Sequence, residues 1–126
     1  MIDKDSVRVL IDAVYESHYE HYAEYFGNTL VGFFSDEPAF ENQVFGKERF
    51  DFGFYEAKIG KHSLALPWNE RVLLGMRERL GYDPIPHLNL LWYEDDVGGA
   101  DQGELRHAYM DMITNLYAEC FTKQIG

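Results

Sequence analysis

The stretch "TLVGFFSDEPAF" (Thr29–Phe40) decides the predicted fold. Its first half is apolar, β-branched and aromatic, whereas its second half begins with a serine, two acids and a proline. A short strand that is apolar on both sides is typical of the middle of a sheet covered by helices. Leu30–Phe34 is therefore predicted to be a buried strand, which ends on the adjacent carboxylates Asp36 and Glu37.

A long helix is predicted immediately before this strand, over Asp5–Phe26. Apolar and aromatic residues recur there at steps of three and four, which gives the helix one buried stripe. Asp5 or Ser6 is a suitable residue to begin it, and Gly27-Asn28 is a suitable stop. Helix, tight turn and buried strand together form one αβ unit.

Two further helices are predicted in the second half of the chain. One covers about Asn69–Leu80 and ends at Gly81, a residue suited to a left-handed helix stop. The other begins with the capping-box residues Asp101 and Glu104, and its apolar stripe includes the single Cys120. The sequence thus predicts a helix-rich α/β fold with three long helices and one principal strand.

Length and charge limit the function classes that are open to the chain. Its 126 residues suit a single domain, residues 1–126. The 22 acidic and 11 basic residues give a net charge of −11, which repels phosphate backbones and anionic membrane surfaces. No apolar run approaches the ~20 residues of a membrane span, and the amino terminus lacks the apolar core of a signal peptide. We therefore expect a cytoplasmic protein with no nucleic-acid or membrane partner.

Five phrases of the sequence carry a resemblance: "VYESHYEHYAEYFGNTLVGFFSDEP", "LPWNERV", "ERLGYDP", "LLWYED" and "RHAYMDMITNLYAECFTKQIG". Together they resemble the catalytic-domain core of large bacterial glycoside hydrolases of the α-L-rhamnosidase-like kind. Those proteins are (β/α)8 barrels with added β-sandwich domains. The resemblance implies that the chain is a partial (β/α)8-barrel fragment, and that the strand after its last helix lies beyond Gly126.

The resemblance also gives the "SDEP" carboxylates a role. Barrel glycosidases place an acid/base Glu at a strand end, in a short motif of a polar residue, Glu and Pro. Glu37 becomes the candidate catalytic acid, and Asp36 the neighbour that orients it or a sugar hydroxyl, although better-known families have Asn there. Carbohydrate is the expected substrate of the parent enzyme, with Trp68, Trp92 and Asp95 as candidate substrate-binding residues. Tryptophans are also common core anchors, so that alternative stays open for both.

Glycoside hydrolysis needs a second carboxylate on the opposite side of the bond. The two carboxyl groups are about 5 Å apart in retaining enzymes and about 6.5–9.5 Å apart in inverting ones. Asp36 and Glu37 cannot form that pair, because successive side chains of a strand point to opposite faces. Asp95 and Asp96 are conceivable partners, but the resemblance implies a residue on a later strand. The chain by itself is therefore expected to be an incomplete enzyme.

The alternative function is a non-catalytic, acidic, helix-rich interaction module. Leu30–Phe34 and the aromatic loop after it would expose apolar area, and such area usually recruits another chain. A homo-oligomer is therefore predicted. No cofactor or metal is expected: His18 and His21 fit an amphipathic surface stripe. The single Glu104-x-x-His107 step lacks the second motif that a di-iron bundle requires.

Overall fold

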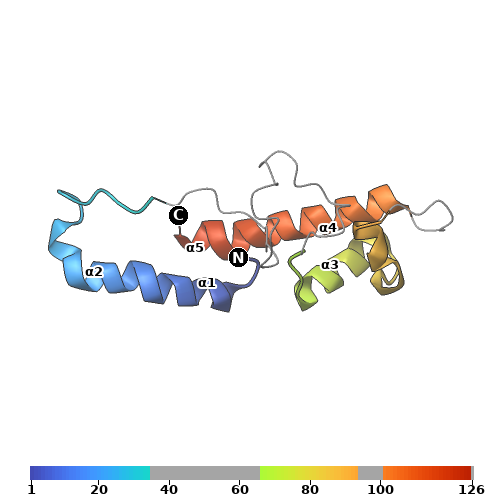
Figure 1. Cartoon of the computed structure of the whole chain (residues 1–126), viewed down its shortest axis with the longest axis horizontal. Coiled ribbons are helices and arrows are strands. Elements are labelled where there is room, and N and C mark those ends of the chain that lie inside the picture. The colour runs from blue at the N-terminus through green and yellow to red at the C-terminus, as the bar shows by residue number, and fades with distance from the viewer. Residues whose placement is uncertain (35–65, 94–100, 126) are drawn as a thin grey trace, which may run out of the picture. The chain divides into compact units, whose positions relative to one another are not determined.

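The computed structural model describes residues 1–34, 66–93 and 101–125. Within these ranges every regular element is a helix (Figure 1). The chain divides into two compact units, Met1–Ala39 with Leu116–Gly126, and Phe40–Asn115. Each unit is described by itself below.

The first unit begins with a helical segment that is interrupted at Tyr22, whose backbone is not helical at φ −128° and ψ 19°. It consists of α1 (Lys4–Leu10), the π-helix η1 (Ile11–Glu16), α2 (Ser17–Tyr22) and the 3-10 turn η2 (Ala23–Tyr25). These bounds confirm the long helix predicted before Gly27. The cap is Asp3 rather than the predicted Asp5 or Ser6, because its carboxylate accepts the Ser6 backbone N–H at 2.8 Å. That hydrogen bond lowers the pKa of Asp3.

The predicted strand Leu30–Phe34 is not formed, so the α/β fold and the barrel fragment predicted from the sequence are wrong. After η2 the chain reverses direction: the Thr29 and Leu30 N–H groups donate to the Tyr25 carbonyl at 3.0 and 2.8 Å. Gly27 makes this reversal possible at φ +84°. Residues 31–34 belong to no regular element, and the described residues contain no strand for them to pair with. A strand requires a neighbour for its backbone groups, and an apolar run by itself does not supply one.

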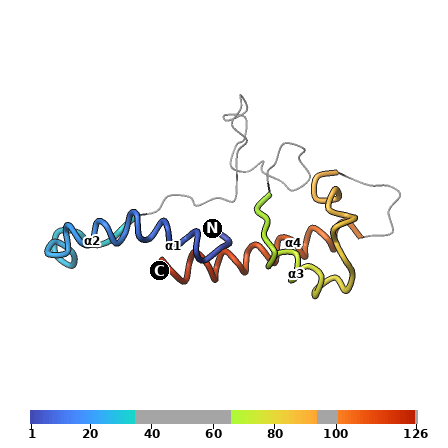
Figure 2. Tube along the Cα trace, turned by 90° about the horizontal axis from the view of Figure 1, so that it is seen from below, coloured from blue at the N-terminus to red at the C-terminus, as the bar shows by residue number. Residues whose placement is uncertain are grey.

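The first unit is completed by the carboxyl-terminal helix. Here α4 (Gln102–Tyr117) continues as the π-helix η4 (Ala118–Thr122) and then as α5 (Lys123–Ile125). Figures 1 and 2 both show α1 beside this end of the chain, with the two segments running in the same direction. A small apolar core joins them, made of the buried Val7, Ile11 and Phe121, with the partly buried Tyr15, Tyr117 and Ile125 against it.

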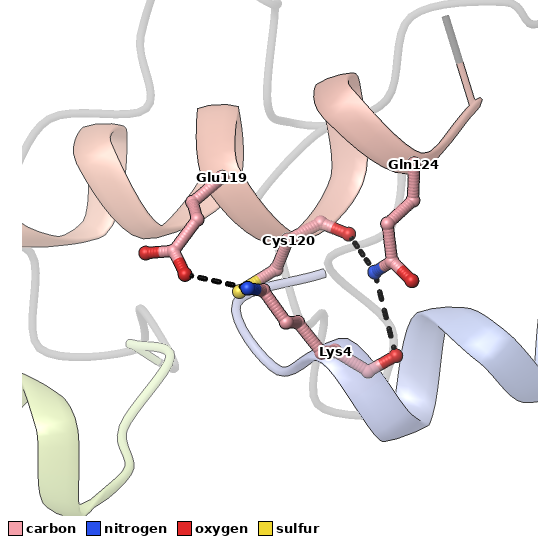
Figure 3. Close-up of polar contacts among 4 residues, drawn as sticks. All are labelled: Lys4, Glu119, Cys120 and Gln124. Carbon is pink, nitrogen blue, oxygen red and sulfur yellow. Dashed lines mark hydrogen bonds and ion pairs between the residues drawn. The ribbon is translucent and has the colours of Figure 1, made fainter.

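Polar contacts surround this core (Figure 3). The Lys4 ammonium lies 2.8 Å from the Glu119 carboxylate, and the Gln124 side-chain amide donates to the carbonyl oxygens of Lys4 and Cys120. Cys120 is fully buried, as the sequence predicted. An exposed ion pair of this kind contributes about 0–1 kcal/mol, so the apolar contacts hold α1 in place.

The second unit contains α3 (Glu70–Leu80), the 3-10 helix η3 (Ile85–Leu91) and the first part of α4. Asn69 caps α3, because its side-chain oxygen accepts the Val72 N–H at 3.0 Å. Gly81 ends the helix at φ +75°, and its N–H donates to the Arg77 carbonyl at 2.9 Å. The start near Asn69 and the stop at Gly81 were predicted from the sequence, and both are confirmed.

α3, η3 and α4 share one apolar core. Its buried side chains are Val72, Met76, Leu90, Leu91, Leu105, Ala108, Tyr109 and Ile113. α3 approaches α4 closely at Gly75, where a Cβ atom would overlap the end of the Met112 side chain. Arg106 of α4 provides a hydrogen-bond donor for a backbone carbonyl at the end of η3: its Nε donates to the Leu90 carbonyl at 2.8 Å.

Replacing Gly81 with alanine is expected to lower the free energy of unfolding by about 1 kcal/mol. A Cβ atom at this position meets nothing within 4 Å, so the cost comes from the left-handed backbone and not from crowding. Urea unfolding of both chains measures the difference. Gly81→Asn is the control and should cost less, because asparagine tolerates this conformation. An alanine variant as stable as the unsubstituted chain would contradict the assigned helix stop.

Candidate functional site

The catalytic residues predicted from the sequence, Asp36 and Glu37, lie outside the described residues, as does the predicted substrate contact Asp95. The structure therefore places none of the three carboxylates. It does remove the strand that put Asp36 and Glu37 at a barrel edge, because Leu30–Phe34 is not a strand. Their catalytic role stays a prediction without that support.

The two tryptophans proposed to bind sugar both lie in the second unit. Trp68 is half-exposed, and its ring stacks on that of Tyr109 with centroids 6.4 Å apart and an interplanar angle of 9°. Trp92 is half-buried where η3 ends, and its backbone N–H donates to the Asn89 carbonyl at 3.0 Å. Trp68 thus has a packing contact of its own, which is what the core-anchor alternative expects of it.

A surface of exposed rings lies on the first unit. We define this aromatic face as Tyr15, His18, Tyr19, Tyr22, Phe26 and Phe33. Tyr19 is 54% exposed and Tyr22 is 50% exposed. None of the residues 12–34, all of which the structure describes, is buried. Aromatic side chains of this size are usually buried in a core or in an interface.

Phe33 holds the aromatic face together. Its ring centroid lies 4.6 Å from that of Tyr15, 5.6 Å from that of Phe26 and 5.9 Å from that of His18. The contacts with Tyr15 and His18 are edge-to-face, which is a favoured arrangement of two rings. The segment after the Gly27 turn therefore folds back onto the helix before it. Phe34, the next residue, is left 89% exposed.

The aromatic face continues the apolar stripe that begins in α1. Val7 and Ile11 are covered by Phe121, but Val14 and Tyr22, further along the same stripe, are exposed. The sequence predicted one buried stripe along the whole helix, and this is wrong beyond Ile11. The reason lies in the fold: among the described residues only the segment after the Gly27 turn lies on the later turns, through Phe33, and it buries none of their side chains.

The histidines of α2 are fixed against their own helix. Nδ1 of His18 donates to the Val14 carbonyl at 2.6 Å, and Nδ1 of His21 donates to the Ser17 carbonyl at 2.7 Å. Both rings also contact Tyr22, with centroids 6.3 and 6.2 Å from its ring. In the described part of the chain no three histidine, cysteine or carboxylate residues are grouped as a metal would need. Of the two histidines, His18 belongs to the aromatic face.

An acidic row borders the aromatic face. Asp12, Glu16 and Glu20 follow one another at four-residue steps along the helix, and Asp12 and Glu16 each precede a face residue by three positions. Glu24 follows them in the 3-10 turn η2, after the helix breaks at Tyr22. Arg8 begins the row, with its guanidinium 2.5 Å from Asp12 and 3.3 Å from Glu16. The hydrogen bond to Asp12 raises the pKa of Arg8. The sequence analysis missed this row, although its four-residue spacing was visible.

In the described ranges, no helix combines the length and the apolar character that crossing a membrane requires. Comparisons with models of protein families, with curated proteins and with solved structures give no match. The resemblance to the rhamnosidase-like hydrolases therefore stays a prediction that rests on the sequence phrases.

Proposed function

We propose that the chain is a non-catalytic interaction module, which binds another protein chain through the aromatic face. The observation that supports this is the exposure of the aromatic face: Tyr19 and Tyr22 are about half exposed, and residues 12–34 include no buried side chain. Exposed apolar patches beyond a few hundred Å² usually mark interaction sites. Aromatic residues are also enriched in the interfaces of protein complexes.

The shape of this surface favours a protein partner over a small substrate. Small-molecule sites are concave and bury most of their ligand. The aromatic face instead lies on the outside of a helix, η1 and α2, with the 26–34 segment folded against it. A helix face of this kind is bound along another helix or in a groove. The homo-oligomer predicted from the sequence is one form that such binding can take.

Site-specific photo-crosslinking tests this function. A photoreactive phenylalanine analogue at position 22 of the full chain, in cells that produce it, should give an adduct of defined mass. The same analogue in place of Leu74, an exposed residue of α3, is the matched control and should give none. Adding Tyr19→Ser should weaken the adduct from position 22, because it removes a neighbouring ring. Equal crosslinking from both positions, or none from either, would contradict the proposal.

A further inference from the structure

We infer that the partner of the aromatic face is a basic amphipathic helix of another protein. This inference rests on the proposed function and names the chemistry of the chain that the face binds. It depends on two features of the first unit: the exposed apolar and aromatic residues on η1 and α2, and the acidic row beside them.

The form of the aromatic face suits a helix. Val14, His18 and Tyr22 follow at four-residue steps, and Tyr15 and Tyr19 form the neighbouring row. Such rows are the ridges that pack into the grooves of a second helix. The helices η1 and α2 offer a bound strand no row of free backbone N–H and carbonyl groups, whereas residues 31–34, which belong to no regular element, contact them through Phe33. A helix with an apolar stripe about three turns long would therefore cover the aromatic face.

The charge of the surface selects a basic partner. Arg8 is the single basic side chain paired with the acidic row in the described residues, and it contacts only Asp12 and Glu16. Glu20 and Glu24 have no ion pair among the described residues, and Glu16 and Glu20, like charges four residues apart on the helix, repel each other. Lysine or arginine beside the apolar stripe of a bound helix would meet these carboxylates and reduce the repulsion.

The same charge argues against a second copy of this chain on the face. Another copy would bring a second acidic row to the edge of the interface, and each chain carries a net charge of −11. Like charges placed opposite each other across an interface cost binding energy. The charge therefore disfavours a homo-oligomer through this face. Self-association is the competing outcome that the experiment tests.

Two synthetic peptides of about 18 residues, long enough to form a helix when bound, serve as probes. One has a leucine stripe with lysine elsewhere, and the other has the same leucine stripe with glutamate elsewhere. Fluorescence anisotropy with the full chain should show binding of the lysine peptide only. Its affinity should fall as salt is added, since exposed ion pairs are screened.

Matched variants locate the binding site. Glu20→Gln with Glu24→Gln should weaken lysine-peptide binding by about tenfold, because two contacting carboxylates are lost. Glu70→Gln with Glu78→Gln on α3 changes the net charge by the same amount and should leave the affinity within about twofold. Tyr19→Ser with Tyr22→Ser should weaken binding at least as much as the first pair. Circular dichroism checks that each variant keeps its helices.

The outcomes separate this inference from the proposed function. Equal weakening by both glutamate pairs would overturn the inference, since binding would then follow net charge. Equal binding of both peptides would overturn the basic partner and leave the interaction function standing. A dimer in sedimentation that Tyr19→Ser with Tyr22→Ser abolishes, without peptide binding, would replace the basic helix with a second copy. Neither peptide binding nor self-association would overturn the inference, and the crosslinking experiment would then decide the proposed function.

Discussion

Replacing Tyr109 with alanine is expected to lower the free energy of unfolding by about 3–5 kcal/mol, the usual cost of deleting a fully buried aromatic side chain. Tyr109 has no exposed surface, stacks on Trp68, and donates its hydroxyl to the Pro67 carbonyl at 2.8 Å. The variant therefore loses apolar burial, a ring contact and a hydrogen bond together. Urea unfolding measures the loss. Met110→Ala, at the exposed neighbour on α4, is the control and should cost under about 0.5 kcal/mol.

The hydroxyl of Tyr109 has an effect of its own. Tyr109→Phe should cost about 1 kcal/mol at neutral pH, because only the hydrogen bond to Pro67 is lost. Burial raises the pKa of Tyr109, so the folded state holds the phenol proton that the unfolded chain releases near pH 10. This contribution to stability is complete below about pH 10 and is lost as the pH rises further. The decline of stability in alkali should thus be shallower for Tyr109→Phe. Equal costs for Tyr109→Ala and Met110→Ala would contradict the buried position of the ring.

Replacing Phe121 with alanine is expected to release α1 from the carboxyl-terminal helix. Phe121 is buried in the core that joins them, together with Val7 and Ile11, and its ring stacks on Tyr117 at 5.1 Å. Removing a buried phenylalanine costs about 3–5 kcal/mol, more than a core this small can lose. α1 is the first part of a helical segment that runs to Tyr22, and the helicity of its turns depends on this packing, since a helix without a packed face is only marginally stable in water.

Hydrogen exchange followed residue by residue measures this release. Amides of α1 should lose their protection in Phe121→Ala, whereas those of α3, which belongs to the other unit, should keep theirs. Phe34→Ala is the matched control, because it removes the same side chain from a position that is almost fully exposed. Protected α1 amides in Phe121→Ala would show that Phe121 does not hold the helix.

The parts of the fold that the sequence predicted correctly depend on local signals. Asn69 and Gly81 bound α3 as expected, and Asp101 accepts the Glu104 N–H at 3.1 Å at the start of α4. Each of these contacts joins residues a few positions apart, so the sequence contains all of the information. Leu30–Phe34 is the opposite case. Whether an apolar run becomes a strand depends on a distant partner strand, and the sequence of the run itself does not reveal that partner.

The candidate site shows the same difference between local signals, which the sequence contains, and distant contacts, which it does not reveal. The sequence predicted a helix whose apolar stripe includes His18 and Tyr22 of the aromatic face, and the helix is present. It could not tell which turns the rest of the chain covers, because that depends on Phe121, about a hundred residues away from Ile11 and Tyr22. The stripe from Val14 to Tyr22 was therefore expected to be buried when it is exposed. The predicted catalytic role of Glu37 depended on the strand, and its support was lost with it.

The π-helix η1 determines the direction around the helix axis in which the aromatic face points. A π-helical turn spans about one residue more than an α-helical turn, so η1 shifts every later side chain around the helix axis. Shortening Ile11–Glu16 by one residue would turn His18 and Tyr22 by about 100° relative to Val7. The direction in which the rings point is thus encoded in the length of this segment. A single insertion or deletion there could redirect the surface while leaving every aromatic residue in place.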